Sequence, residues 1–135
     1  MNRLTRIFFL AALLVGCQHP IAPWEEVDLS KAVKIEPSAQ YIAWWNELEA
    51  CSRLSGNVHA VAFYVIPNDS TIQVGSESYW GYWIKDGNKV VLAGTWADNE
   101  KLVKHEEMHA LLQSPLHPPA YFNGSCGDLT YPNEG

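Results

Sequence analysis

The sequence is poor in basic residues and cysteines, and it has no apolar stretch long enough to cross a membrane as a helix. Its 135 residues include nine lysines and arginines against fifteen acidic residues and only three cysteines, with a formal net charge of −6. Such a chain offers no basic patch to a phosphate backbone, so nucleic acid is not an expected partner. Internal repeats and low-complexity tracts are also absent, which argues against repeat architectures. The length suits one compact domain, and we expect a monomer.

The N-terminus combines two arginines with a short apolar run. Arg3 and Arg6 precede the apolar residues 7–15, a run too short to span a bilayer. Residues 1–16 are therefore predicted to be a signal peptide and are left out of the fold prediction. Residues 14–17 read Leu-Val-Gly-Cys, which resembles the lipobox of bacterial lipoproteins.

The lipobox resemblance implies cleavage before Cys17 and attachment of acyl chains to this residue, which would anchor the protein in the bacterial cell envelope. Gln18, rather than aspartate, follows the cysteine, and in the Gram-negative sorting pattern this implies the outer membrane, facing the periplasm. Because the remaining chain is acidic, we expect membrane contact only through the lipid. The alternative is an ordinary secretory signal that is cleaved nearby. Residues 17–37, with three prolines and several charges, are predicted to be a lipidated tether with weak structure.

Two cysteines remain once Cys17 is assigned to the lipid. Cys51 and Cys126 form an even pair in an oxidising compartment, so we predict a disulfide between them. It would bind the end of an N-terminal helix to the C-terminal segment. Two buried free thiols are the alternative.

Residues 105–109 read His-Glu-Glu-Met-His, a His-Glu-x-x-His pattern. Residues four apart lie on one face of a helix, so the imidazoles of His105 and His109 can bind the same zinc ion. Glu106 lies about 100° further around the helix, where it could act as general base on a zinc-bound water. This chemistry is metal-assisted hydrolysis of a peptide bond. The alternative is an amphipathic helix with two incidental histidines.

The segment around the motif is predicted to be a helix over residues 98–113. It is rich in strong helix formers, and Thr95 or Asp98 can serve as its N-cap. Pro115 biases the residue before it away from helical angles and ends the helix. We expect a mostly buried helix with one narrow polar side. The residues assigned to that polar side are Glu100, Lys104 and Glu107.

A catalytic zinc ion usually has three protein ligands and leaves one position for water. His117 is the predicted third ligand, because the chain turns after Pro115 and can bring this imidazole back to the metal. A surface loop histidine is the alternative. Tyr121 is a candidate for stabilising the oxyanion, with a packing role as the alternative. His59 is expected to be a partly buried strand histidine rather than a ligand.

The motif is similar to that of the zincin metallopeptidases, but it departs from two of their subgroups. Metzincins have a glycine at the position of Leu112 and a third histidine two residues earlier than His117. Gluzincins take a glutamate from a later helix, for which too little chain remains.

A wider resemblance, over roughly residues 38–126, is to small bacterial zincin-like lipoproteins. Those proteins share a tryptophan-rich helix that ends in cysteine, as residues 44–52 do here. The resemblance implies a zincin-like metal-binding domain at residues 38–135. The other segments that carry it are residues 105–112, His117-Pro118-Pro119, Tyr121-Phe122 and Cys126.

The remaining pattern predicts an α+β fold. Residues 38–52 are predicted to form a helix that starts at Ser38, with Trp44 and Trp45 in a core stripe. An antiparallel or mixed sheet should pack on the motif helix and on this N-terminal helix. The predicted strands are residues 58–66, at the centre of the sheet, then 71–74, and a hairpin of 79–85 and 88–93 around Asp86-Gly87.

Together these features predict a zinc-dependent metallopeptidase with one Zn²⁺ ion and a peptide or protein substrate. Zincins commonly bind substrate as an extra strand on a sheet edge, and the hairpin from Tyr79 is a candidate edge. Trp80, Tyr82 and Trp83 could then line subsites, or they could belong to the core. The competing class is a non-catalytic zinc-binding lipoprotein of the envelope, which keeps zinc for structure or sequesters it. A fourth protein ligand would favour structural zinc.

Overall fold

The computed structural model describes residues 27–131. The predictions for the signal peptide, for Cys17 and for residues 17–26 of the tether lie outside these residues. Within them, no helix is long and apolar enough to cross a membrane.

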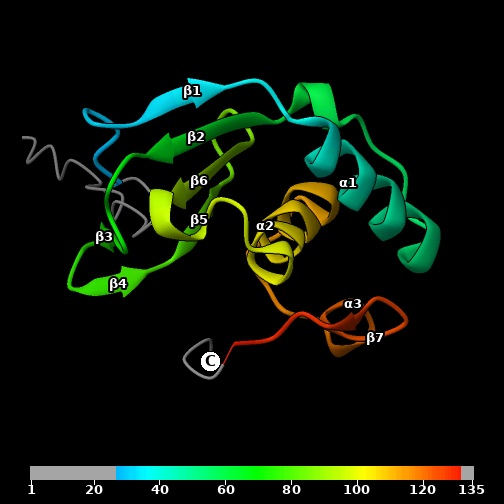
Figure 1. Cartoon of the computed structure of the whole chain (residues 1–135). Coiled ribbons are helices and arrows are strands. Elements are labelled where there is room, and N and C mark those ends of the chain that lie inside the picture. The colour runs from blue at the N-terminus through cyan, green and yellow to red at the C-terminus, as the bar shows by residue number, and fades with distance from the viewer. Residues whose placement is uncertain (1–26, 132–135) are drawn as a thin grey trace, which may run out of the picture.

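A mixed four-stranded sheet, in the order β1-β2-β6-β5, lies at the centre of the fold (Figure 1). β2 (Ala62–Ile66) runs parallel to β6 (Lys89–Ala93). The outer strands β1 (Val33–Ile35) and β5 (Gly81–Ile84) run antiparallel to their neighbours. The predicted α+β class is therefore confirmed, and β5 forms one edge of this sheet.

Two helices, α1 (Ala39–Ser52) and α2 (Glu100–Leu112), pack on one face of the sheet and against each other (Figure 1). α1 begins as predicted, because the Ser38 hydroxyl accepts a hydrogen bond from the backbone N–H of Tyr41. It ends at Ser52, as predicted, and the next residue, Arg53, adopts a left-handed conformation. The predicted tryptophan stripe is confirmed, since Trp44 and Trp45 are buried.

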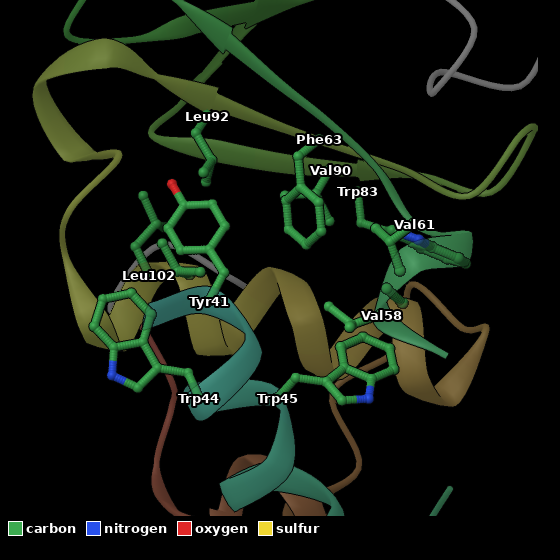
Figure 2. Close-up of a cluster of buried hydrophobic side chains, with 12 residues drawn as sticks. Tyr41, Trp44, Trp45, Val58, Val61, Phe63, Trp83, Val90, Leu92 and Leu102 are labelled. Atoms are coloured by element: carbon green, nitrogen blue, oxygen red, sulfur yellow. The ribbon is translucent and has the colours of Figure 1, made fainter. Parts of the chain in front are cut away.

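The main core lies between these helices and the sheet (Figure 2). Aromatic side chains of α1 meet those of β2 and β5 there, and the hydroxyl of Tyr41 donates to the carbonyl of Ala97 just before α2. This core fixes α2 against β5, the arrangement on which the site depends. Its members are Tyr41, Trp44, Trp45, Val58, Val61, Phe63, Trp83, Val90, Leu92, Leu102, Val103 and Ala110.

A second cluster covers the other face of the sheet. It joins β5 and β6 to a two-stranded ribbon of β3 (Ile72–Val74) and β4 (Glu77–Tyr79). Its buried members are Ile66, Ile72, Val74, Ile84, Val91 and Ala93.

The C-terminal segment packs on the side of α2 away from the sheet (Figure 1). It contains α3 (Pro119–Phe122) and the short strands β7 (Asn123–Gly124) and β8 (Gly127–Asp128). A third cluster, of Leu48, Met108, Phe122 and Leu129, joins this segment to both long helices. The predicted disulfide between Cys51 and Cys126 is confirmed beside this cluster.

Three sequence predictions about the strands need correction. Residues 58–66 are not one strand, because the Asn57 side chain accepts from the N–H of His59 and starts a 3₁₀ turn at Val58–Ala60. His59 is consequently exposed in that turn rather than partly buried in a strand. Tyr79 pairs with β3 and not within the hairpin. The expectation of weak structure up to residue 37 also fails at β1, which pairs with β2.

Candidate metal centre

Helix α2 presents the histidine motif on one buried face. Asn99 is its N-cap, with its side-chain oxygen accepting from the backbone N–H of Leu102, so neither Thr95 nor Asp98 has the predicted role. Thr95 instead lies in the 3₁₀ turn Gly94–Trp96 that precedes the helix. The helix ends at Gln113, which adopts a left-handed conformation.

The imidazoles of His105, His109 and His117 converge through their Nε2 atoms. The Nε2 atom of His109 lies 3.0 Å from that of His105 and 3.1 Å from that of His117, and the third side of the triangle is 3.3 Å. A tetrahedral ion with metal–nitrogen bonds of about 2.0–2.1 Å separates its nitrogen ligands by about 3.3–3.4 Å. The three histidines therefore lie close enough to bind one metal ion.

Backbone carbonyls determine which nitrogen of two of these rings is protonated. His105 Nδ1 lies 2.7 Å from the carbonyl oxygen of Leu129, and His109 Nδ1 lies 2.8 Å from that of Ser114. A carbonyl oxygen only accepts, so each Nδ1 must donate its N–H. In the neutral imidazole the Nε2 atom then carries a lone pair. Two such lone pairs 3.0 Å apart repel each other, and a cation between them removes that repulsion.

Burial keeps the three rings in the form that binds metal. Burial, assisted by the neighbouring His109, lowers the pKa of His105 to about 3. It lowers the pKa of His109 to about 4, and it also lowers the pKa of the less buried His117. Neutral imidazoles bind metal ions, whereas protonated ones do not, so the site is ready for a ligand at neutral pH.

His117 reaches the site because the chain reverses after α2. Pro118 and Pro119 follow it directly, and Pro119 occupies the first turn of α3, where its missing N–H costs nothing. The fully buried Phe122 at the end of α3 packs against all three imidazoles, with ring centroids 4.9 Å from His105 and 4.8 Å from each of the other two. This ring gives the site an apolar floor, which sequence reasoning missed.

Glu106 lies between α2 and the edge strand β5. Its side chain is 3% exposed, and it packs so closely on Gly81 that a Cβ atom at that position would come within 2.8 Å of Glu106 Oε1. The candidate ligand atoms of the three histidines all lie within 4.8 Å of one another, and the carboxylate of Glu106 does not belong to that group. Glu106 directly follows His105 in α2, and its carboxylate is held against Gly81 of β5.

Glu107 does not lie on a polar face, contrary to the prediction. Helix α1 covers that side of α2, and Glu107 is 0% exposed. Neither carboxylate oxygen has a hydrogen-bond partner among residues 27–131. Burial raises the pKa of Glu107 to about 9, so it is protonated at neutral pH. The other two residues of the predicted face, Glu100 and Lys104, form an ion pair, and Lys104 also reaches Glu47.

Two tyrosines differ in their relation to the histidines. Tyr121 is partly buried and packs in the cluster with Phe122 and Leu129. Tyr131 instead contacts a ligand ring directly, with its centroid 5.6 Å from that of His105. It lies 26 positions beyond that residue in the sequence, and no local pattern could have found it. On the other side of the site, Trp83 stacks on His109 at 6.2 Å and belongs to the core.

The described part of the chain supplies three nitrogen ligands, and no fourth His, Cys, Asp or Glu side chain joins them. Three ligands, an apolar floor and an adjacent carboxylate suit an ion that activates a small molecule. The chain gives no match to any protein-family model, to the curated proteins or to the solved structures.

Proposed function

We propose that this protein is a membrane-anchored, zinc-dependent metallopeptidase that hydrolyses peptide bonds. The observation that carries the proposal is that three Nε2 atoms lie within 3.3 Å of one another. In two of these rings the Nδ1 atom donates its proton to a backbone carbonyl, which leaves the Nε2 lone pair to bind a metal ion. An all-imidazole set of three suits zinc in a hydrolytic site. His105, His109 and His117 would hold the ion.

The chemistry divides between the ion and the protein. Bound zinc supplies a Lewis acid that makes water a better nucleophile at neutral pH. Glu106 accepts the proton of the attacking water and passes it to the leaving amine. Its packing on Gly81 holds the carboxylate in position, and its burial strengthens the proton transfer by keeping bulk water away. Tyr121, from the sequence, and Tyr131, from its contact with His105, are the candidates for stabilising the oxyanion.

The edge strand β5 supports a peptide as substrate. The backbone N–H of Ala93 donates to the carbonyl of Trp80, which makes this a hydrogen-bonded pair of the β5–β6 ladder. Such pairs alternate in an antiparallel ladder, so the backbone groups of Gly81 and Trp83 point away from β6. Within residues 27–131 no further strand pairs with this edge. An extended peptide that adds here would lie beside Glu106.

The proposed location is the bacterial envelope, with the lipid on Cys17 anchoring the domain to the outer membrane on its periplasmic side. The lipobox resemblance supports it, and the Cys51–Cys126 disulfide is typical of an oxidising compartment.

A non-catalytic zinc protein, with structural or sequestered zinc, is the second candidate. The observation in its favour is the depth of the site, because His105 and His109 are 1% and 6% exposed. Buried ligands protect a structural ion from exchange. The set of three ligands favours the enzyme, since structural zinc usually has four.

The test compares two matched substitutions in the zinc-loaded full-length protein. Glu106→Gln should retain one zinc per chain and lose peptide hydrolysis by at least about a hundredfold. Glu107→Gln, the same change one residue along, should retain both. Hydrolysis that survives Glu106→Gln, or a wild-type protein that does not bind stoichiometric zinc, would refute the peptidase.

A further inference from the structure

Trp80 is one of the few large apolar side chains that remain exposed in the described chain, with 39% of its surface accessible. It directly precedes β5, the edge strand beside Glu106. Its ring stacks on Trp96 with centroids 4.5 Å apart, and its edge contact with Tyr131 is at 5.5 Å. Because Tyr131 also contacts His105, a continuous run of rings connects the exposed indole to a metal ligand.

This run of rings is held firmly in place. Trp96 donates its indole N–H to the carbonyl of Ser70, which fixes the ring that supports Trp80. Lys101 places its ammonium 4.9 Å from the centroid of Tyr131, in a cation–π contact. A rigid aromatic surface loses little conformational entropy when a ligand covers it, which favours binding.

We infer that Trp80, with Tyr131 at its edge, forms a specificity subsite for a large apolar or aromatic side chain of a peptide bound along β5. This inference rests on the proposed peptidase. A peptide strand that pairs with the outward backbone groups of Gly81 and Trp83 places one side chain opposite Trp80, because cross-strand neighbours lie about 5 Å apart. Glu106 packs on Gly81, so the recognised side chain belongs to a residue within one or two positions of the cleaved bond.

The charge around the run favours an apolar side chain over an acidic or basic one. Lys101, the cation that contacts Tyr131, is also paired with the carboxylate of Asp128 at 3.4 Å. An indole face without a competing charge attracts an aromatic ring through burial and through edge or offset stacking.

The test uses alanine hexapeptides that carry a single phenylalanine at each position in turn, with hexa-alanine as reference. The zinc-loaded wild-type protein should cleave one peptide of the set at least about tenfold more efficiently, in kcat/KM, than the reference. Trp80→Ala should remove this preference. Trp80→Phe, which keeps an aromatic ring, should retain most of the preference. Val33→Ala, at an exposed apolar residue on the opposite edge strand β1, is the matched control and should leave the preference unchanged.

A binding measurement separates failure of the subsite from failure of the enzyme. The zinc-loaded Glu106→Gln protein should bind the preferred peptide at least about tenfold more tightly than hexa-alanine, as measured by calorimetry, and Glu106→Gln with Trp80→Ala should not. A wild type that binds with this preference but cleaves nothing would refute the peptidase and keep the subsite. If the Trp80→Ala variant keeps the same preference for the phenylalanine peptide as the protein with Trp80, in cleavage or in binding, the subsite is refuted and the peptidase is not. Absence of any preference in the wild type would overturn it too.

Discussion

Removal of the Cys51–Cys126 disulfide should destabilise the fold and weaken metal binding together. The bond closes a loop between residues separated by 75 positions. In the chain-entropy model, a loop of this length stabilises the folded state by about 4.5 kcal/mol at 25 °C, because the crosslink restricts the unfolded chain. We expect the free energy of unfolding to fall by about 3 kcal/mol, since disulfides often contribute less than this model value.

The effect on the metal follows from the position of the bond in the C-terminal segment. Cys126 lies three residues before Leu129, whose carbonyl accepts the Nδ1 proton of His105. Without the disulfide, the carbonyl of Leu129 is held in place by the packing of Leu129 and Phe122 in the third cluster. Loss of a hydrogen bond that orients a ligand typically lowers metal affinity by about 10–100-fold. Partial loosening should give the lower end of that range, about tenfold.

The assay is urea unfolding of the zinc-free protein, together with zinc affinity from competition with a chromophoric chelator. The zinc-free state matters because bound zinc itself stabilises the fold by mass action. The variant is Cys51→Ala with Cys126→Ala, since replacing both residues leaves no unpaired thiol in the domain. An unfolding free energy that falls by less than about 1 kcal/mol, with unchanged zinc affinity, would show that packing alone holds the segment and would refute the reasoning.

Three further predictions concern single residues of the site. His117→Ala should lower zinc affinity more than about 100-fold in chelator competition, whereas the exposed His59→Ala should leave it unchanged. Gly81→Ala should displace the Glu106 carboxylate and lower kcat by about 10–100-fold in a peptide assay, with zinc content unchanged; an unaffected kcat would contradict this positioning. In the folded state Glu107 keeps its proton, whereas the unfolded chain releases that proton above the ordinary pKa of 4.5. The buried carboxyl group therefore destabilises the fold increasingly as pH rises from 4.5 toward about 9. Glu107→Gln should therefore make the zinc-free protein about 3 kcal/mol more stable at pH 7, as measured by denaturant titration. This gain in stability should disappear near pH 4.5, the ordinary pKa of the group. A difference in stability that does not depend on pH would refute the burial argument.

Local signals in the sequence predicted the elements that depend on neighbouring residues. Ser38 was predicted to cap α1 and does so, because capping needs only a side-chain oxygen three residues from an N–H. The cap of α2 was misassigned to Thr95 or Asp98 instead of Asn99. All three residue types favour that position, so composition could not separate them. The 3₁₀ turn before the helix decides which one lies at the N-cap.

The fate of Glu107 shows where pattern reasoning fails. Its place beside Lys104 and Glu100 in the helical repeat is typical of a solvated face. Helix α1 packs over this position, and only the fold could show that a carboxyl group lies buried there. The parallel pairing of β2 with β6 could likewise not be predicted from local pattern, since three strands lie between them in the sequence and must be placed before the pairing is defined.

The sequence by itself determined that His105 and His109 share a helix face with Glu106 one residue on, because a regular helix fixes that spacing. It also predicted the disulfide that the structure shows, and it named His117, which the structure places close to the other two histidines. The tertiary structure decided everything that makes these residues a site. The carbonyl that orients His105 lies 24 residues away, the ring of Phe122 supports all three imidazoles, and Gly81 holds the carboxylate from another element. Ring orientation, burial and protonation depend on contacts between distant segments, and such contacts exist only after the chain has packed.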